Sequence, residues 1–254
     1  MENSKLVDVA VFNGLKILVP VELQRVFTDF ESFSSKYVQR LLKAGDVFVD
    51  VGANFGFYSR LASEIVGASG RVIAIEPSPA TLNILTQNVA ELENVTIVPL
   101  AVSTKSGQID FYHTDDYVNS GSVENPPFID SSRVTKVSVP SKSLDRILVD
   151  DFSLSEIQFL KIDVQGDDVE VLLSCEDVLS KSNDVKILVE WAPTWMINAG
   201  RDPMDLPTTL VKLGFKNVCC IDDWLKRETS IEEFYVDYKE DGSGKRFCNI
   251  VGSR

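Results

Sequence analysis

Four carboxylates stand at the ends of short apolar runs: Asp50 in VFVDV, Glu76 in RVIAIEP, Asp163 in FLKIDV and Glu190 in VKILVE. Carboxylates can bind a cation, accept hydrogen bonds from hydroxyl groups, or take up a proton as a general base. Each apolar run has the length of a buried strand, and helix-like patterns separate the runs. We therefore expect an α/β fold with a mainly parallel sheet. Such a sheet gathers these acids at the carboxyl ends of its strands, where ligands bind.

A glycine turn follows the first of these acids. Its spacing, Asp50-x-Gly52-x-Asn54-x-Gly56, lacks the middle glycine of the GxGxxG turn that cradles a pyrophosphate. An acid before the turn disfavours a diphosphate and favours a ligand that carries an ammonium or sulfonium group. S-adenosylmethionine has both cations and no phosphate. Glu76, at the end of the second strand, stands where a carboxylate can accept hydrogen bonds from ribose hydroxyls.

Composition excludes several classes of protein. The net charge of -13, without a compensating basic stripe, argues against a nucleic acid partner. No apolar run approaches the ~20 residues of a spanning helix, and the first residues do not form a secretory signal. We therefore expect a cytoplasmic protein without membrane insertion. His113 is the only histidine, which excludes the HExxH zinc motif, and the four cysteines form no CxxC pair.

Patterns along the chain predict one domain. The pair Asn13-Gly14 indicates a tight hairpin, and NVTIVPLAV is expected to form the third strand of the sheet. We expect four parts: an N-terminal hairpin and helix (1–45), a cofactor-binding half (46–102), an inserted hairpin on the substrate side (103–142) and the second half of the sheet (143–254).

Three segments together resemble a known family. In order, DVFVDVGANFGFYS, VIAIEPSPATLNILTQN and FLKIDVQGDDVEVL resemble the FkbM family of S-adenosylmethionine-dependent methyltransferases, over residues 46–190. The resemblance implies a Rossmann-like class I methyltransferase fold, with a seven-stranded sheet whose last strand is antiparallel and helices on both faces. It also implies methyl transfer from S-adenosylmethionine to a hydroxyl of a small molecule, a sugar or a glycan.

The resemblance further implies positions for the cofactor. Glu76 would contact the ribose and Ala101, in PLAV, the adenine. The residues implied around the methionine moiety are Asp50, Gly52, Asn54 and Gly56, and further cofactor contacts are expected at Ala53, Phe57 and Pro77. One position departs from the family pattern KIDVEG, because Gln165 replaces the glutamate. This departure keeps open a second hypothesis, a Rossmann-like protein that binds the cofactor without catalysis. A third hypothesis, an NAD-dependent oxidoreductase, is disfavoured by the glycine spacing and by Asp50.

The catalytic candidates are Asp163, Glu190 and His113. Asp163 is the first candidate for the base that removes the acceptor proton, although it could instead cap the next helix or support the cofactor. Glu190 would face the same crevice, where a pair of carboxylates could raise one pKa or chelate Mg²⁺. No third ligand is marked, so no metal site is assigned. A histidine side chain titrates near neutrality, as a base should, but a lone surface histidine is the commoner case.

Two further features leave alternatives open. The stretch Asn119–Ser122 resembles the polar loop that faces the substrate in this family, and could also be an ordinary turn. Trp191 and Trp195 could stack on a sugar or simply pack. The acceptor and the oligomeric state are not determined by the sequence.

Overall fold

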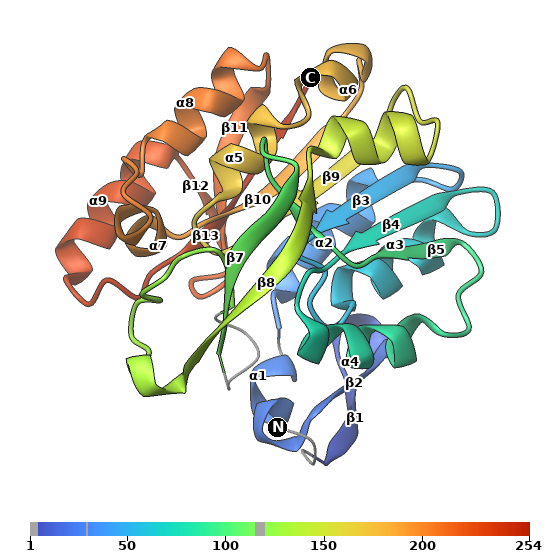
Figure 1. Ribbon diagram of the computed structural model, residues 1–254. Helices are drawn as coiled ribbons and strands as arrows, with labels where there is room; N and C mark the ends of the chain where they lie inside the picture. Colours follow the sequence, from blue (N-terminus) through green and yellow to red (C-terminus); the bar gives the residue numbers. More distant parts are fainter. Residues whose placement is uncertain (1–4, 29, 115–119) are drawn as a thin grey trace.

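The central element is an eight-stranded sheet. The computed structural model describes residues 5–28, 30–114 and 120–254. The strands lie in the order β12-β11-β13-β10-β9-β3-β4-β5 (Figure 1). Their bounds are β3 (Val47–Val51), β4 (Arg71–Ile75), β5 (Val95–Val98), β9 (Phe159–Ile162), β10 (Lys186–Trp191), β11 (Lys216–Asp222), β12 (Arg227–Thr229) and β13 (Cys248–Ser253).

The direction of the strands agrees with the expected α/β class. Strands β5, β4, β3, β9 and β10 pair in parallel, and β13 is antiparallel both to β10 and to β11.

The sheet has eight strands, one more than the seven that were predicted. The eighth strand, β12, has three residues and pairs antiparallel with β11 at the edge of the sheet. A segment this short has too few residues for a period-2 pattern to mark it as a strand.

Helices cover both faces of this sheet. Side chains alternate along each strand, so that Phe48 and Phe159 stack on one face at 5.2 Å while Val49 and Leu160 pack on the other. The first face is covered by α2 (Ser32–Leu41) and α3 (Phe57–Val66). The elements packed on the second face are α5 (Asp168–Leu173), α6 (Glu176–Lys181), α7 (Pro193–Asn198), α8 (Asp205–Lys212), α9 (Ile231–Asp241) and the π-helical segment Arg146–Asp151.

The N-terminal hairpin lies beside α4 (Pro79–Val89), as Figure 1 shows. It consists of β1 (Leu6–Ala10) and β2 (Lys16–Pro20), and Asn13 and Gly14 adopt the positive φ angles that its turn requires. The amide of Asn88 on α4 accepts from the Leu18 amide at 2.7 Å and donates to the Leu18 carbonyl at 2.9 Å. A short helix, α1 (Gln24–Phe27), follows the hairpin. The predicted hairpin is therefore confirmed.

The inserted hairpin forms a separate small sheet. Strands β7 (Gly107–Thr114) and β8 (Val134–Lys142) are antiparallel and pass in front of the main sheet in Figure 1. Strand β6 (Ala101–Val102) pairs with β8, whereas the sequence predicted that NVTIVPLAV would form one strand of the main sheet. The segment divides because β5 ends at Val98 and the chain then turns at Pro99. Among the described residues, no helix combines the length and the apolar composition that crossing a bilayer requires.

Candidate functional site

Two cavities meet at the carboxyl ends of β3 and β9. The first cavity has an empty volume of about 820 Å³ and the second about 1150 Å³, each including its open mouth. Both are lined by Gly52, Asn54, Asp163 and Gln165. Two ligands bound in these cavities would therefore face each other across the same four residues.

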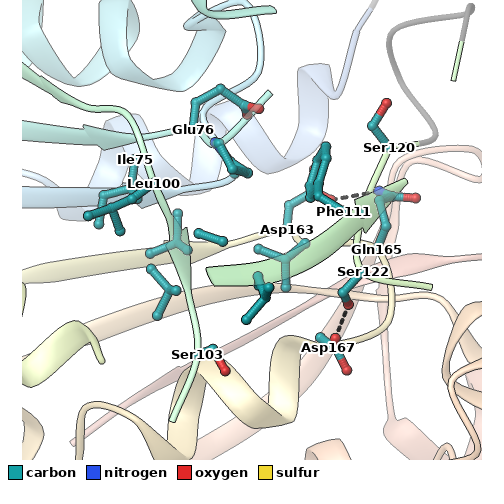
Figure 2. A pocket seen from close by; sticks show the side chains of 18 of the residues that line it. Ile75, Glu76, Leu100, Ser103, Phe111, Ser120, Ser122, Asp163, Gln165 and Asp167 are labelled. Carbon is teal, nitrogen blue, oxygen red and sulfur yellow. Dashed lines mark hydrogen bonds between the residues drawn. The ribbon is translucent and has the colours of Figure 1, made fainter. Parts of the chain in front are cut away.

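The charged side chains that line the first cavity are all carboxylates among the described residues. The described residues that line it include no lysine, arginine or histidine. Figure 2 shows Glu76, Asp163 and Asp167 around this cavity. Its fourth carboxylate belongs to Glu170. Its apolar lining consists of Val51, Ile75, Leu100, Ala101, Val102, Ile109, Phe111 and Val164, with Pro77 beside Glu76. This charge balance suits a ligand with positive charge and opposes a polyphosphate.

The glycine turn shapes the junction of the two cavities. Gly52 has a φ of +78°, and a Cβ built on it would lie 1.8 Å from the carbonyl oxygen of Asp163. Gly52 is therefore required both by its backbone conformation and by a close approach between β3 and the end of β9. Gly56 has a different role, because it lines neither cavity and a Cβ built on it would lie only 2.6 Å from Leu85 Cδ1 of α4.

Glu76 is held by backbone amides at the wall of the first cavity. Its Oε1 accepts from the Ser78 amide at 2.8 Å, and its Oε2 accepts from the Asn54 amide at 2.9 Å. Burial raises the pKa of Glu76 above its usual value, and these two amides partly offset that effect. Each oxygen keeps a lone pair with which it can accept a bond from a hydroxyl group of a ligand.

Asp50 does not face either cavity, contrary to the expectation from the sequence. It is fully buried, directly opposite Lys161 in the pairing of β3 with β9. Lys161 Nζ lies 3.4 Å from Asp50 Oδ1, and Ser59 donates to Oδ2 at 2.6 Å. The acid therefore balances a buried cation of the protein itself. Lys161 in turn donates to the Gly52 carbonyl at 2.8 Å, so Asp50 supports the glycine turn indirectly.

Gln165 joins the two carboxylates that the sequence singled out as bases. Its Nε2 donates to Asp163 Oδ1 at 2.8 Å, drawn in Figure 2, and to Glu190 Oε2 at 2.9 Å. Lys161 Nζ lies 3.6 Å from the other oxygen of Asp163. Burial and the charge of Asp163 raise the pKa of Glu190 well above its usual value. An amide in this position supplies a donor to both acids, which an ionised glutamate could not do.

The second cavity has aromatic walls. Its polar lining residues include Glu31, Lys161 and Glu190. Lys245 and Arg246, from the C-terminal part of the chain, also line it. The aromatic residues are Phe27, Phe30, Phe55, Phe57, Tyr58, Phe128, Trp195 and Phe247. Ala53 and Phe57, expected at the cofactor, line this second cavity rather than the first.

His113 is not among the residues that line the two cavities. Its Nδ1 is 3.4 Å from Ser78 Oγ and 3.3 Å from Ser120 Oγ, and the side chain is buried. The structure therefore does not bring it together with Asp163 and Glu190. Ser120 and Ser122 line the first cavity, whereas Asn119 lies outside the described residues.

The two tryptophans have different positions. Trp191 is fully buried, and its Nε1 donates to the Pro203 carbonyl at 2.8 Å. Trp195 lines the second cavity. Packing is therefore the role of the first, and only the second can contact a ligand in these cavities.

Sequence reasoning missed several residues of the site. Lys161 had a recognisable signal, because a lysine inside the apolar strand FLKI must be buried with a partner. Glu31 and Tyr58 had no recognisable signal in the sequence, because an acid before a helix and a tyrosine on an apolar helix face are both common. In the described part of the chain, no group of three or more His, Cys, Asp or Glu side chains is arranged to hold a metal ion.

Structural comparison shows the fold. The chain is similar to a methyltransferase FkbM from Methylobacillus flagellatus KT, with a TM-score of 0.51, 12% identity, and coverage of 91% of this chain and 52% of that one. It is also similar to a TehB-like SAM-dependent methyltransferase from Corynebacterium glutamicum, with a TM-score of 0.50, 11% identity and 92% coverage of each chain. A putative transferase from Pyrococcus horikoshii has a TM-score of 0.50 and 13% identity, over 99% of this chain and 71% of that one.

Sequence comparison shows the family. A search of curated protein sequences finds no match. The model of the methyltransferase FkbM domain matches residues 50–216, which include the glycine turn, Glu76, Asp163 and Glu190. This chain therefore belongs to the FkbM methyltransferase family.

Proposed function

We propose that this methyltransferase binds S-adenosylmethionine in the first cavity and transfers its methyl group to a hydroxyl of a small molecule, sugar or glycan in the second. The observation that carries the proposal is the meeting of the two cavities at Gly52, Asn54, Asp163 and Gln165. A methyl group held at this junction would have its acceptor on the side opposite to its donor. That arrangement is the one an in-line displacement needs.

The residues of the first cavity fit this cofactor. Glu76 supplies acceptors for ribose hydroxyls, and the wall near Ala101 suits an adenine ring. The carboxylate of Asp163 is a counter-charge for a cationic ligand at the junction. The described residues that line the first cavity include no cationic side chain, which a diphosphate would require. These features favour S-adenosylmethionine over NAD.

The chain contributes mainly alignment and exclusion of water. S-adenosylmethionine, when bound, supplies a methyl group on a positively charged sulfur. Gln165 holds Asp163 and Glu190 in fixed positions beside the junction, where their carboxyl groups can bind the acceptor hydroxyl. The aromatic walls of the second cavity displace water from the reacting groups. Aromatic rings beside carboxyl groups also suit an acceptor with an apolar ring face and hydroxyl groups.

Calorimetry tests the cofactor. We expect S-adenosylmethionine to bind and NAD not to bind. Glu76→Gln should weaken that binding by about 1 to 3 kcal/mol, because a carboxylate acceptor is lost. Glu91→Gln is the control, since Glu91 is exposed and lines neither cavity. Binding of NAD in preference to S-adenosylmethionine would refute the proposal.

A labelling experiment tests the acceptor class. The protein is incubated with S-adenosylmethionine carrying a radiolabelled methyl group and with a panel of sugars, nucleotide sugars, glycans and phenols. We expect label in a product that resists mild base, as an ether does. Label found only in esters or amines would show that the acceptor is not a hydroxyl group.

A further inference from the structure

Glu31 lies in the second cavity, in a segment outside the family match at residues 50–216. It occupies the N-cap position of α2 with a left-handed backbone, at a φ of 41°. An N-cap acid usually accepts from the first amides of its own helix, but the Glu31 side chain makes no such bond. Asp223, after β11, accepts from the amides of Phe33 and Ser34 at 2.7 and 3.1 Å instead. The Glu31 carboxylate is thus free of a capping role.

Two donors from the core fix this carboxylate. The Tyr58 hydroxyl donates to Glu31 Oε2 at 2.5 Å, and Asn249 Nδ2 donates to the same oxygen at 3.3 Å. Asn249 is itself held by Ser34 Oγ at 3.0 Å. Both donors reach Oε2, so Oε1 has no donor in the described part of the chain. One oxygen of a positioned carboxylate therefore remains available in the cavity.

We propose that Glu31 is the catalytic base that accepts the proton of the acceptor hydroxyl, an inference that rests on the proposed function. The acceptor oxygen forms a bond to the methyl carbon, while the electron pair of the broken carbon–sulfur bond stays on sulfur. The hydroxyl proton moves to Oε1 of Glu31. The positive charge of the donor and the negative charge of the carboxylate disappear together, so the step balances.

The other two carboxylates are less suited to this task. Lys161 Nζ lies 3.6 Å from one oxygen of Asp163 and the Gln165 amide donates to the other at 2.8 Å, so both oxygens already have partners. Burial and the charge of Asp163 raise the pKa of Glu190 well above its usual range, which favours its protonated form. Asp163 and Glu190 can bind the acceptor, and the proton then goes to Glu31.

Burial and the neighbouring charges raise the pKa of Glu31. Burial is the largest cause, and the charges of Asp163 and Asp223 act in the same direction. The Tyr58 hydroxyl and the Lys161 ammonium oppose them, and the resulting pKa is about 7. A base works best when its pKa lies close to the working pH.

The direct test uses the protein saturated with S-adenosylmethionine and needs no acceptor. Carbon-13 NMR follows the side-chain carboxyl carbons, and the Glu31 signal is assigned by its loss in Glu31→Gln. We expect the Glu31 signal to titrate near pH 7. Titration at about pH 4, the ordinary value for a glutamate in water, would overturn the proposal.

The kinetic test uses the acceptor identified by methyl labelling. Glu31→Gln should lower kcat by about 100-fold or more and leave binding of S-adenosylmethionine unchanged, while Glu22→Gln should keep full activity. Tyr58→Phe removes a bond that lowers the pKa of Glu31, so the acid limb of kcat/KM should move to higher pH. If the wild-type protein does not bind S-adenosylmethionine, the proposed function fails. If it binds and transfers methyl groups, and Glu31→Gln does so equally well, only the role of Glu31 fails.

Discussion

Asp50 and Lys161 form a buried ion pair across two central strands, with Lys161 Nζ 3.4 Å from Asp50 Oδ1. Burial alone would lower the pKa of Lys161, but Asp50 and Asp163 outweigh it and shift that pKa upward. Lys161 therefore remains charged inside the sheet. Because Lys161 also donates to the Gly52 carbonyl, the pair fixes the turn at the junction of the two cavities.

Loss of Asp50 should destabilise the fold. Asp50→Asn removes one of the two carboxylates that pair with Lys161 and leaves Asp163 at 3.6 Å, and we expect the free energy of unfolding to fall by about 3 kcal/mol. Urea unfolding measures this change. Adding Lys161→Met should restore part of the lost stability, because no unpaired charge remains. Additive losses in the double variant would show that the two side chains are not coupled.

Gly52→Ala should prevent formation of the junction. The added Cβ would lie 1.8 Å from the Asp163 carbonyl oxygen, and the φ of +78° is itself unfavourable for alanine. Gly14→Ala is the matched control, since Gly14 has a φ of +80° and open space around it. We expect about 1 to 2 kcal/mol of destabilisation for the control and more than about 3 kcal/mol for Gly52→Ala. Equal losses in thermal or urea unfolding would refute the steric role.

Gln165→Glu should destabilise the protein in a pH-dependent way. The new side chain places a third carboxyl group between Asp163 and Glu190 and removes the donor that both accept. Its pKa in the folded protein should exceed its unfolded value of about 4, so stability relative to wild type should fall as the pH rises from about 5 to 8. We expect a loss of about 1 to 3 kcal/mol at pH 8.

Urea unfolding at both pH values provides the measurement for this variant. Gln87→Glu, on the exposed surface of α4, serves as the control and should show little dependence on pH. A loss of the same size at pH 5 and pH 8 would indicate a packing defect rather than repulsion between carboxylates.

Glu31→Gln should stabilise the protein at alkaline pH. The folded-state pKa of Glu31 is about 7 against 4.5 for the ordinary side chain, so ionisation of Glu31 costs folding free energy. The cost is absent below about pH 4.5, increases between that pH and about 7, and is fully present above. We expect the variant to gain about 1 to 3 kcal/mol over wild type between pH 4 and pH 8.

Unfolding curves of wild type and Glu31→Gln at several pH values measure this difference. Glu22→Gln should follow wild type at every pH, because Glu22 is exposed. A difference between Glu31→Gln and wild type that does not change with pH would contradict the raised pKa of Glu31. A stability gain with lost catalysis would be typical of a residue kept for function.

Much of the fold was predictable because its signals are local. Apolar runs bounded by turns mark β3, β4, β9 and β10, and Asn13-Gly14 marks the first hairpin. Parallel strands bring their carboxyl ends to one edge, so the placement of Glu76 and Asp163 beside one cavity also followed. The very short β12 and the division of NVTIVPLAV into β5 and β6 did not follow, because pairing partners decided them.

The sequence by itself determined the family, the order of the elements and the acids at the strand ends, because these depend on patterns within a few residues. Only the tertiary structure decided what each acid faces. Asp50 pairs with Lys161, which lies far along the chain, and His113 contacts Ser78 and Ser120 but lines neither cavity. The second cavity combines segments from both ends of the chain, including Glu31 and Phe247. A charged side chain takes its role from its neighbours in space, and no local pattern records neighbours so far apart along the chain.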